Sequence, residues 1–209
     1  MAVQNTDRRR PVQESVLIVN QDMKTLLQQT ETAMGGTNRS YTQLINRLGQ
    51  EKKLHYATRP IPGQMIFFRY EPATQKFVNS PNTYYDIFPL VLITDVRKEG
   101  FEGINFHYLD PESRMFLLNQ LKTTLPSAES KNWKKRLVVE YSNLRARRRL
   151  KFFRPCYRKY LWAGVEKVPV MIPFEYWNDV CGAELGAFVG RRKPYVYRES
   201  IKIINRENS

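Results

Sequence analysis

Residues 84–93 read YYDIFPLVLI and residues 104–110 read INFHYLD, two aromatic-rich apolar blocks separated by a short, more polar stretch. The first predicts a strand with Pro89 at its start, where a missing N–H does little harm. A turn around Gly100 and Gly103 then leads to a strand over residues 104–109. The run GQMIFFRYEP predicts another strand, starting at Gly63. Because these apolar runs are continuous and not alternating, we expect a small, strongly curved antiparallel sheet or barrel at about residues 60–110.

The apolar side chains of these strands should form the main hydrophobic cluster. Its expected members are Met65, Ile66, Phe67, Phe68, Leu90, Val91, Leu92, Ile93, Ile104, Phe106 and Leu109. Further along the chain, Trp162 and Trp177 are candidates to cap a second cluster. The run VPVMIP at 168–173 predicts a short strand, and a helix is expected after Pro173.

Helices are expected on both sides of the sheet, which makes the fold class α+β. Asp110 is placed as the N-cap of a helix that begins at Pro111 and stops at Pro126. The predicted divisions are a flexible basic arm (1–14), a helical hairpin (15–58), a small barrel plus helix (59–127), a basic helical and strand extension (128–190) and a polar C-terminal tail (191–209), extended or weakly helical. The basic arm should order only against a partner.

The formal net charge of +14 predicts attraction to a polyanion or to an acidic protein surface. Two isolated cysteines, Cys156 and Cys181, exclude a CxxC zinc knuckle and a disulfide framework and suit a reducing compartment. No stretch approaches the length of a membrane span, and the charged start MAVQNTDRRRP lacks the apolar core of a signal peptide. We expect no cofactor, no metal and no membrane partner.

Most of the charge lies in one block. Residues 131–159 hold twelve lysines and arginines against one acid, Glu140, with aromatic residues interleaved. This mixture suits phosphate contacts with stacking, and equally suits docking on an acidic protein ring. The candidate binding residues are Arg8, Arg9, Arg10, Lys134, Lys135, Arg136, Arg145, Arg147, Arg148, Arg149, Lys151, Arg154, Arg158 and Lys159.

Asp86 and His107 are the first candidates for acid–base catalysis. A catalytic pair normally works with a nucleophile or a metal, and nothing near these residues matches GxSxG, HExxH or a glycine-rich phosphate loop. We therefore expect both to be structural, with Asp86 bonding turn backbone at the entry of a buried strand and His107 in a strand of the same framework. No catalytic residue is predicted.

A metal-dependent nuclease is the more specific enzymatic alternative. Asp95, Glu99 and Glu102 surround one predicted hairpin, and Lys98 is beside them. Nuclease sites need two or three clustered carboxylates, but surface turns also collect acidic residues. We regard this as an outside alternative.

The blocks Phe68-Arg69-Tyr70, Tyr84-Tyr85-Asp86, Phe88-Pro89-Leu90 and Gly103 to Leu109 resemble a family of small proteins of contractile-tailed bacteriophages, often labelled DNA end protector proteins. Pro155 to Leu161 and Ile172-Pro173 with Trp177 resemble its second block. The match spans about residues 63–177, with the N-terminal arm and helical hairpin outside it. The resemblance implies an SH3-like barrel and a virion component with no catalytic residues.

We therefore expect a non-enzymatic structural or assembly protein of the virion, present in the host cytoplasm during assembly. It would bind the ends of packaged double-stranded DNA or neighbouring neck and tail rings. The alternative is a baseplate or tail-tube subunit that docks on acidic neighbours without DNA contact.

Overall fold

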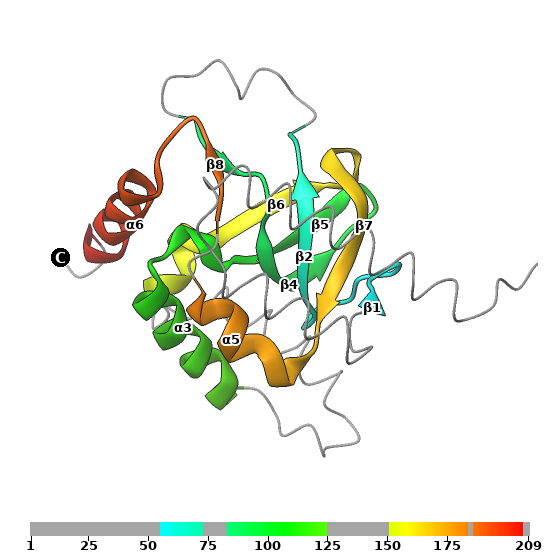
Figure 1. Cartoon of the computed structure of the whole chain (residues 1–209), viewed down its shortest axis with the longest axis horizontal. Coiled ribbons are helices and arrows are strands. Elements are labelled where there is room, and N and C mark those ends of the chain that lie inside the picture. Colours follow the sequence, from blue (N-terminus) through cyan, green and yellow to red (C-terminus); the bar gives the residue numbers. More distant parts are fainter. Residues whose placement is uncertain (1–54, 73–82, 125–150, 184–185, 207–209) are drawn as a thin grey trace, which may run out of the picture.

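The structure is a computed structural model that describes residues 55–72, 83–124, 151–183 and 186–206. In these residues, one antiparallel six-stranded sheet has the strand order β1-β7-β2-β4-β5-β6 (Figure 1). Its strands are β1 (His55–Tyr56), β2 (Met65–Tyr70), β4 (Leu90–Val96), β5 (Gly100–Asn105), β6 (Tyr157–Leu161) and β7 (Val165–Ile172). A separate two-stranded ribbon pairs β3 (Tyr85–Asp86) with β8 (Phe188–Val189).

The α+β class and the antiparallel sheet are confirmed, but limiting the sheet to residues 60–110 was wrong. Strands β6 and β7 come from the region predicted to be an extension, and β7 lies between β1 and β2. The physical reason is the composition of β2, whose residues from Met65 to Phe68 are all buried. A strand without a polar face belongs inside a covered sheet, so β2 has a neighbour on each edge. The SH3-like assignment stays a prediction, and the N-terminal arm and predicted hairpin helices lie outside the described residues.

The predicted position of the third strand was also wrong. Strand β5 begins at Gly100, and the residues Phe106–Tyr108 form a 3₁₀ turn. A Cβ at Gly100 would lie 1.9 Å from the Tyr160 carbonyl oxygen, and one at Gly103 would lie 2.4 Å from Val91 Cγ1. The two glycines therefore do not form a turn; they allow β5 to pass closely between its neighbours β4 and β6.

Helix α3 (Pro111–Thr124) begins where the sequence predicted. Asp110 Oδ1 accepts a hydrogen bond from Ser113 N at 3.0 Å, which confirms the N-cap. Helix α5 (Trp177–Gly182) follows a 3₁₀ turn at Phe174–Tyr176. The tail predicted to be extended or weakly helical instead contains helix α6 (Lys193–Arg206), which buries Val196, Ser200 and Ile204 at helical spacing.

All eleven predicted core residues are buried, but they form two clusters and not one. Alternate residues of each strand face opposite sides of the sheet. One cluster, which includes Met65 and Phe67, packs with residues of α3, α5 and α6, and Trp177 belongs to it. The other includes Ile66 and Phe68, and the partly buried Trp162 packs against it.

The second cluster lies on the concave face of a half-barrel. Strands β4 and β5 lie between β2 and β6. In a flat sheet, the distance between the axes of β2 and β6 would therefore be roughly 14 Å. Nevertheless, the rings of Tyr70 and Tyr160 are 4.9 Å apart, and those of Phe68 and Tyr160 are 5.3 Å apart. The sheet must therefore curve so that its β6 edge approaches the end of β2.

Candidate functional site

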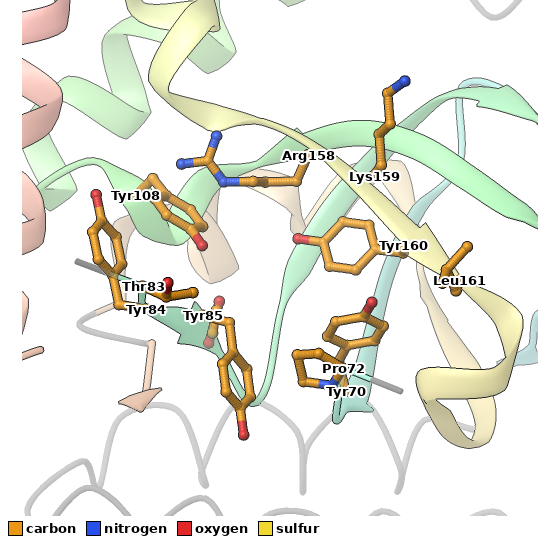
Figure 2. A pocket seen from close by; sticks show the side chains of 11 residues that line it. Tyr70, Pro72, Thr83, Tyr84, Tyr85, Tyr108, Arg158, Lys159, Tyr160 and Leu161 are labelled. Carbon is orange, nitrogen blue, oxygen red and sulfur yellow. The ribbon is translucent and has the colours of Figure 1, made fainter. Parts of the chain in front are cut away.

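A pocket of about 320 Å³ opens where the β6 edge faces the end of β2 and the ribbon strand β3. Five tyrosines line it, from segments far apart in the sequence: Tyr70, Tyr84, Tyr85, Tyr108 and Tyr160. Strand β6 contributes Arg158, which extends over the rings, and Lys159, whose side chain points away from them (Figure 2). The pocket therefore combines flat aromatic rings with positive charge.

Arg158 is held in place by an aromatic ring. Its guanidinium carbon lies 3.9 Å from the centroid of the Tyr108 ring, and Nη1 donates a hydrogen bond to the Tyr157 carbonyl at 2.8 Å. Figure 2 shows this side chain extended across the pocket, above Tyr108. A guanidinium fixed in this way presents its N–H donors without a large further loss of side-chain entropy.

Lys159 lies beside Arg158 and is more accessible, with 70% of its side chain exposed. Its Nζ is 3.2 Å from Glu102 Oε1, and Arg97 Nη2 is 3.1 Å from the same oxygen. Burial by itself raises the pKa of the Glu102 carboxyl, but hydrogen bonds from Tyr157 and Lys159 outweigh it and lower the pKa. Glu102 is thus an ionised anchor that holds the Lys159 ammonium, and Figure 2 shows this side chain directed away from the tyrosine rings.

Asp86 and His107 lie beneath the tyrosines in a buried polar network. Asp86 Oδ2 accepts hydrogen bonds from His107 Nδ1 at 2.7 Å and from Asn105 Nδ2 at 3.0 Å. Its Oδ1 accepts from the backbone N–H groups of Phe88 and Ala187, at 3.1 and 3.4 Å. Burial lowers the pKa of His107, which favours the neutral ring, and the Asp86 carboxylate favours the tautomer that donates from Nδ1. Asp86 therefore bonds backbone at the entry of β4, as predicted, and His107 shares its framework.

The position of His107 differs from the prediction. It belongs to the 3₁₀ turn that follows β5, where Asn105 Oδ1 accepts a hydrogen bond from its backbone N–H at 3.0 Å. Within the described parts of the chain, its Nε2 has no hydrogen-bond partner. The Asp86–His107 pair therefore has no nucleophile next to it there.

The pocket tyrosines are protonated, whereas a tyrosine that acts as a nucleophile must lose its hydroxyl proton. Burial raises the pKa of Tyr70, Tyr84, Tyr85, Tyr108 and Tyr160, so their hydroxyls stay protonated near neutral pH. An activated nucleophile needs a lowered pKa or an adjacent base. The rings are suited to stacking and to donating hydrogen bonds.

The carboxylates of the nuclease alternative do not gather into a metal-binding group. Asp95 pairs with Arg97 at 3.1 Å, and Glu102 is held by Arg97, Lys159 and Tyr157. Among the residues that the structure describes, no three histidine, cysteine or acidic side chains are placed to hold a metal ion. The same residues include no helix long and apolar enough to cross a membrane.

Most predicted binding residues lie outside the described part of the chain. This group comprises Arg8, Arg9, Arg10, Lys134, Lys135, Arg136, Arg145, Arg147, Arg148 and Arg149. Of the others, Lys151 and Arg154 belong to a 3₁₀ turn at Lys151–Cys156, and Arg154 is exposed. Only Arg158 and Lys159 line the pocket.

A second group of cations was missed by the sequence analysis. Arg191, Arg192, Lys193, Arg198, Lys202 and Arg206 lie on α6 or directly before it, with Glu199 as the single acid in residues 191–206. We call these six residues the α6 cations. The composition was visible, but the region was interpreted as a polar tail.

The start of α6 adjoins the pocket. The ring of Tyr195, in the first turn of α6, lies 6.2 Å from that of Tyr84 in the pocket wall. The guanidinium carbons of Arg191 and Arg198 lie 5.1 and 5.9 Å from the Tyr195 ring centroid. The aromatic pocket therefore continues into a basic surface.

Comparison with known proteins places the chain in a family. No curated protein and no solved structure matches it. The family model described as phage T4 terminal DNA protecting protein matches residues 1–203, well beyond the expected 63–177, and so includes the N-terminal region that was expected to lie outside the match. The chain therefore belongs to the phage T4 terminal DNA protecting protein family.

Proposed function

We propose that this protein is a non-enzymatic virion component of a contractile-tailed phage that binds the ends of double-stranded DNA and shields them. The observation that supports the proposal best is the continuity of the aromatic, cationic pocket with the α6 cations, in a chain whose family is described as protecting terminal DNA. Protection of an end requires only that the end be occupied, so no bond need be made or broken.

Phosphate contacts would supply most of the affinity. Arg198 and Lys202 are exposed on α6 and Arg192 is exposed directly before it, where these side chains can follow a DNA backbone without reading bases. The basic block at residues 131–149 and the arginines at 8–10 would add further contacts. Each neutralised phosphate releases counterions, so affinity should fall steeply with salt.

Docking on neighbouring neck, tail or baseplate rings is the competing use of the same cations. An acidic ring would be gripped by arginines at the rim of an interface with aromatic anchors at its centre. DNA is favoured because the tyrosine side chains of the pocket surround a hollow that Arg158 and Lys159 also line. Ring docking is the interpretation to adopt if DNA is not bound.

The test is a salt titration of binding to blunt linear duplex DNA and to a covalently closed circle of the same sequence. We expect tighter binding to the linear form, and protection of it from an exonuclease in proportion to occupancy. Replacing Arg192, Arg198 and Lys202 together with glutamine should make the slope of log K against log salt shallower, by roughly 0.9 for each phosphate that the variant no longer neutralises.

The matched control is Arg59→Gln, an exposed cation at a different groove, which should leave the slope nearly unchanged. Equal binding to linear and circular DNA, together with unprotected ends, would overturn end protection. If neither DNA is bound near physiological salt, ring docking replaces the proposal.

A further inference from the structure

We propose that the pocket between β3, β6 and the end of β2 receives a single terminal nucleotide, unpaired from its complement, with its base on Tyr85 and its phosphate at Arg158. This inference rests on the proposed function and deepens it. It provides the physical basis on which the protein would distinguish a DNA end from the interior of a duplex.

The size of the pocket suits one nucleotide. Its volume of about 320 Å³ is near the lower limit of pockets that hold small organic ligands, roughly 300–1,000 Å³. A base with its sugar is a ligand of this scale, whereas a base pair within a duplex is much larger. Only a nucleotide that leaves the helix can therefore enter.

Tyr85 is the ring best placed to stack on an incoming base. Tyr160 has one face stacked on Phe101 at 5.1 Å, and Arg158 covers a face of Tyr108. Tyr84 is packed by the edges of other rings, including Phe188. Among the described residues, Tyr85 contacts no other aromatic ring at stacking distance, and Figure 2 shows its ring apart from the other four tyrosines. Its side chain is half-buried, which leaves area for a partner.

Arg158 is positioned for the attached phosphate. A guanidinium has five N–H donors, of which Arg158 uses one on the Tyr157 carbonyl while its carbon lies over the Tyr108 ring. Lys159 lies next to it in β6, is largely exposed and pairs with Glu102 on the side away from the rings. The acid of the pocket, Asp86, is buried, and its two oxygens already accept four hydrogen bonds. Within the lining, the charge beside the rings is therefore the Arg158 guanidinium, while Glu71, Arg69 and Glu166 act on Tyr85 from outside the lining.

Selectivity for ends follows from stacking. An internal base must leave two stacked neighbours to flip out, whereas a terminal base leaves one and frays readily. Stacking of a base on one aromatic ring is worth roughly a 10- to 100-fold change in the binding constant. That gain can offset the loss of one stacked neighbour, so a terminal base can enter the pocket while an internal base stays in the helix.

The experiment uses the full-length protein with three duplexes of the same sequence. One is closed by hairpin loops at both ends, one has a single blunt end, and one carries one unpaired nucleotide, 5′ or 3′, at that end. We expect affinity to increase in that order. A 2-aminopurine placed as the unpaired nucleotide should change its fluorescence on binding, because stacking on a tyrosine alters its emission.

Tyr85→Ala should weaken binding to the open ends by roughly 10- to 100-fold and leave binding to the closed duplex unchanged, while Tyr85→Phe should retain the preference. Phe174→Ala removes an exposed ring outside the pocket and serves as the control. If the wild type prefers open ends and Tyr85→Ala keeps that preference and the 2-aminopurine response, the pocket inference is wrong and end binding survives. If the wild type itself binds closed and open duplexes equally, the protein does not recognise DNA ends, and the proposed function is contradicted together with the pocket inference.

Discussion

Asp86 and His107 are joined by a hydrogen bond of 2.7 Å between Oδ2 and Nδ1, and both side chains are almost completely buried. This pair connects the ribbon strand β3 to the 3₁₀ turn after β5, two segments that both contribute tyrosines to the pocket. An aspartate–histidine pair with this geometry is familiar from catalytic sites, but here it supports the wall of the tyrosine-lined pocket.

Asp86→Asn should destabilise the fold while preserving the shape of the side chain. The amide would place N–H donors against the donors of Asn105 and His107, leaving buried polar groups unsatisfied. We expect a loss of about 2–4 kcal/mol in the free energy of unfolding, measured by urea denaturation. The control is Asp95→Asn at a half-exposed ion pair, which should cost less than about 1 kcal/mol. Equal effects of the two substitutions would show that the buried network contributes little.

Stability should decrease on mild acidification because of His107. Burial lowers its pKa in the folded state, although Asp86 opposes this effect, and Arg114 and Lys193 add to it. Because the folded pKa lies below the unfolded value of about 6.5, the unfolded chain takes up the proton first. The contribution is fully present above pH 6.5 and is lost as the pH falls toward the folded pKa, by at most about 1.4 kcal/mol per pH unit.

Chemical denaturation at a series of pH values between about 7.5 and about 5 measures this slope. His107→Asn should flatten it, whereas His55→Asn, at the chain's other histidine, reports the contribution of that residue. An unchanged slope in His107→Asn would mean that the acid sensitivity comes from another group.

Arg114 should be among the most sensitive positions of the fold. This arginine is fully buried and donates hydrogen bonds to the carbonyls of Leu109 and Ala183 and to the Tyr197 hydroxyl, at 2.7, 2.8 and 2.9 Å. It therefore links α3 to the end of α5 and to α6. Arg114→Met leaves these acceptors unsatisfied and should cost about 3 kcal/mol or more.

Arg114→Lys should not restore stability, because one ammonium cannot reproduce the planar, multidentate geometry. The exposed Arg198→Met is the control and should lie within about 0.5 kcal/mol of the wild type. Thermal unfolding of the three variants shows whether the buried Arg114 matters more for stability than the exposed Arg198. A stable Arg114→Met protein would contradict the proposal that Arg114 links the three helices.

Gly100→Ala should disrupt the attachment of β6, which carries Arg158 and Lys159. A methyl group at this position would lie 1.9 Å from the Tyr160 carbonyl oxygen, a backbone atom that cannot move without shifting the strand. We expect a loss of about 1–3 kcal/mol and weaker binding to DNA ends. Gly182→Ala is the matched control, since its nearest neighbour would be Met115 Sδ at 3.8 Å, an ordinary contact. If both variants unfold at the same urea concentration, the close approach of β5 and β6 does not matter for stability.

Residue order alone was enough to predict the strands β2 and β4, the buried character of their residues, and the start of α3 at an Asp110 cap. These features depend on side-chain chemistry within a few residues, which is visible without a fold. Local blocks of residues also identified the family, and composition showed the excess of positive charge.

The way in which distant segments combine became visible only in three dimensions. The pairing of β2 with β7, the 3₁₀ turn at Phe106–Tyr108 and the burial of Arg114 depend on neighbours far along the chain. The pocket depends on them most, because its tyrosines come from residues 70 to 160 and meet only when the sheet curves. Local periodicity carries no information about such pairings, since they are chosen by the packing of whole surfaces.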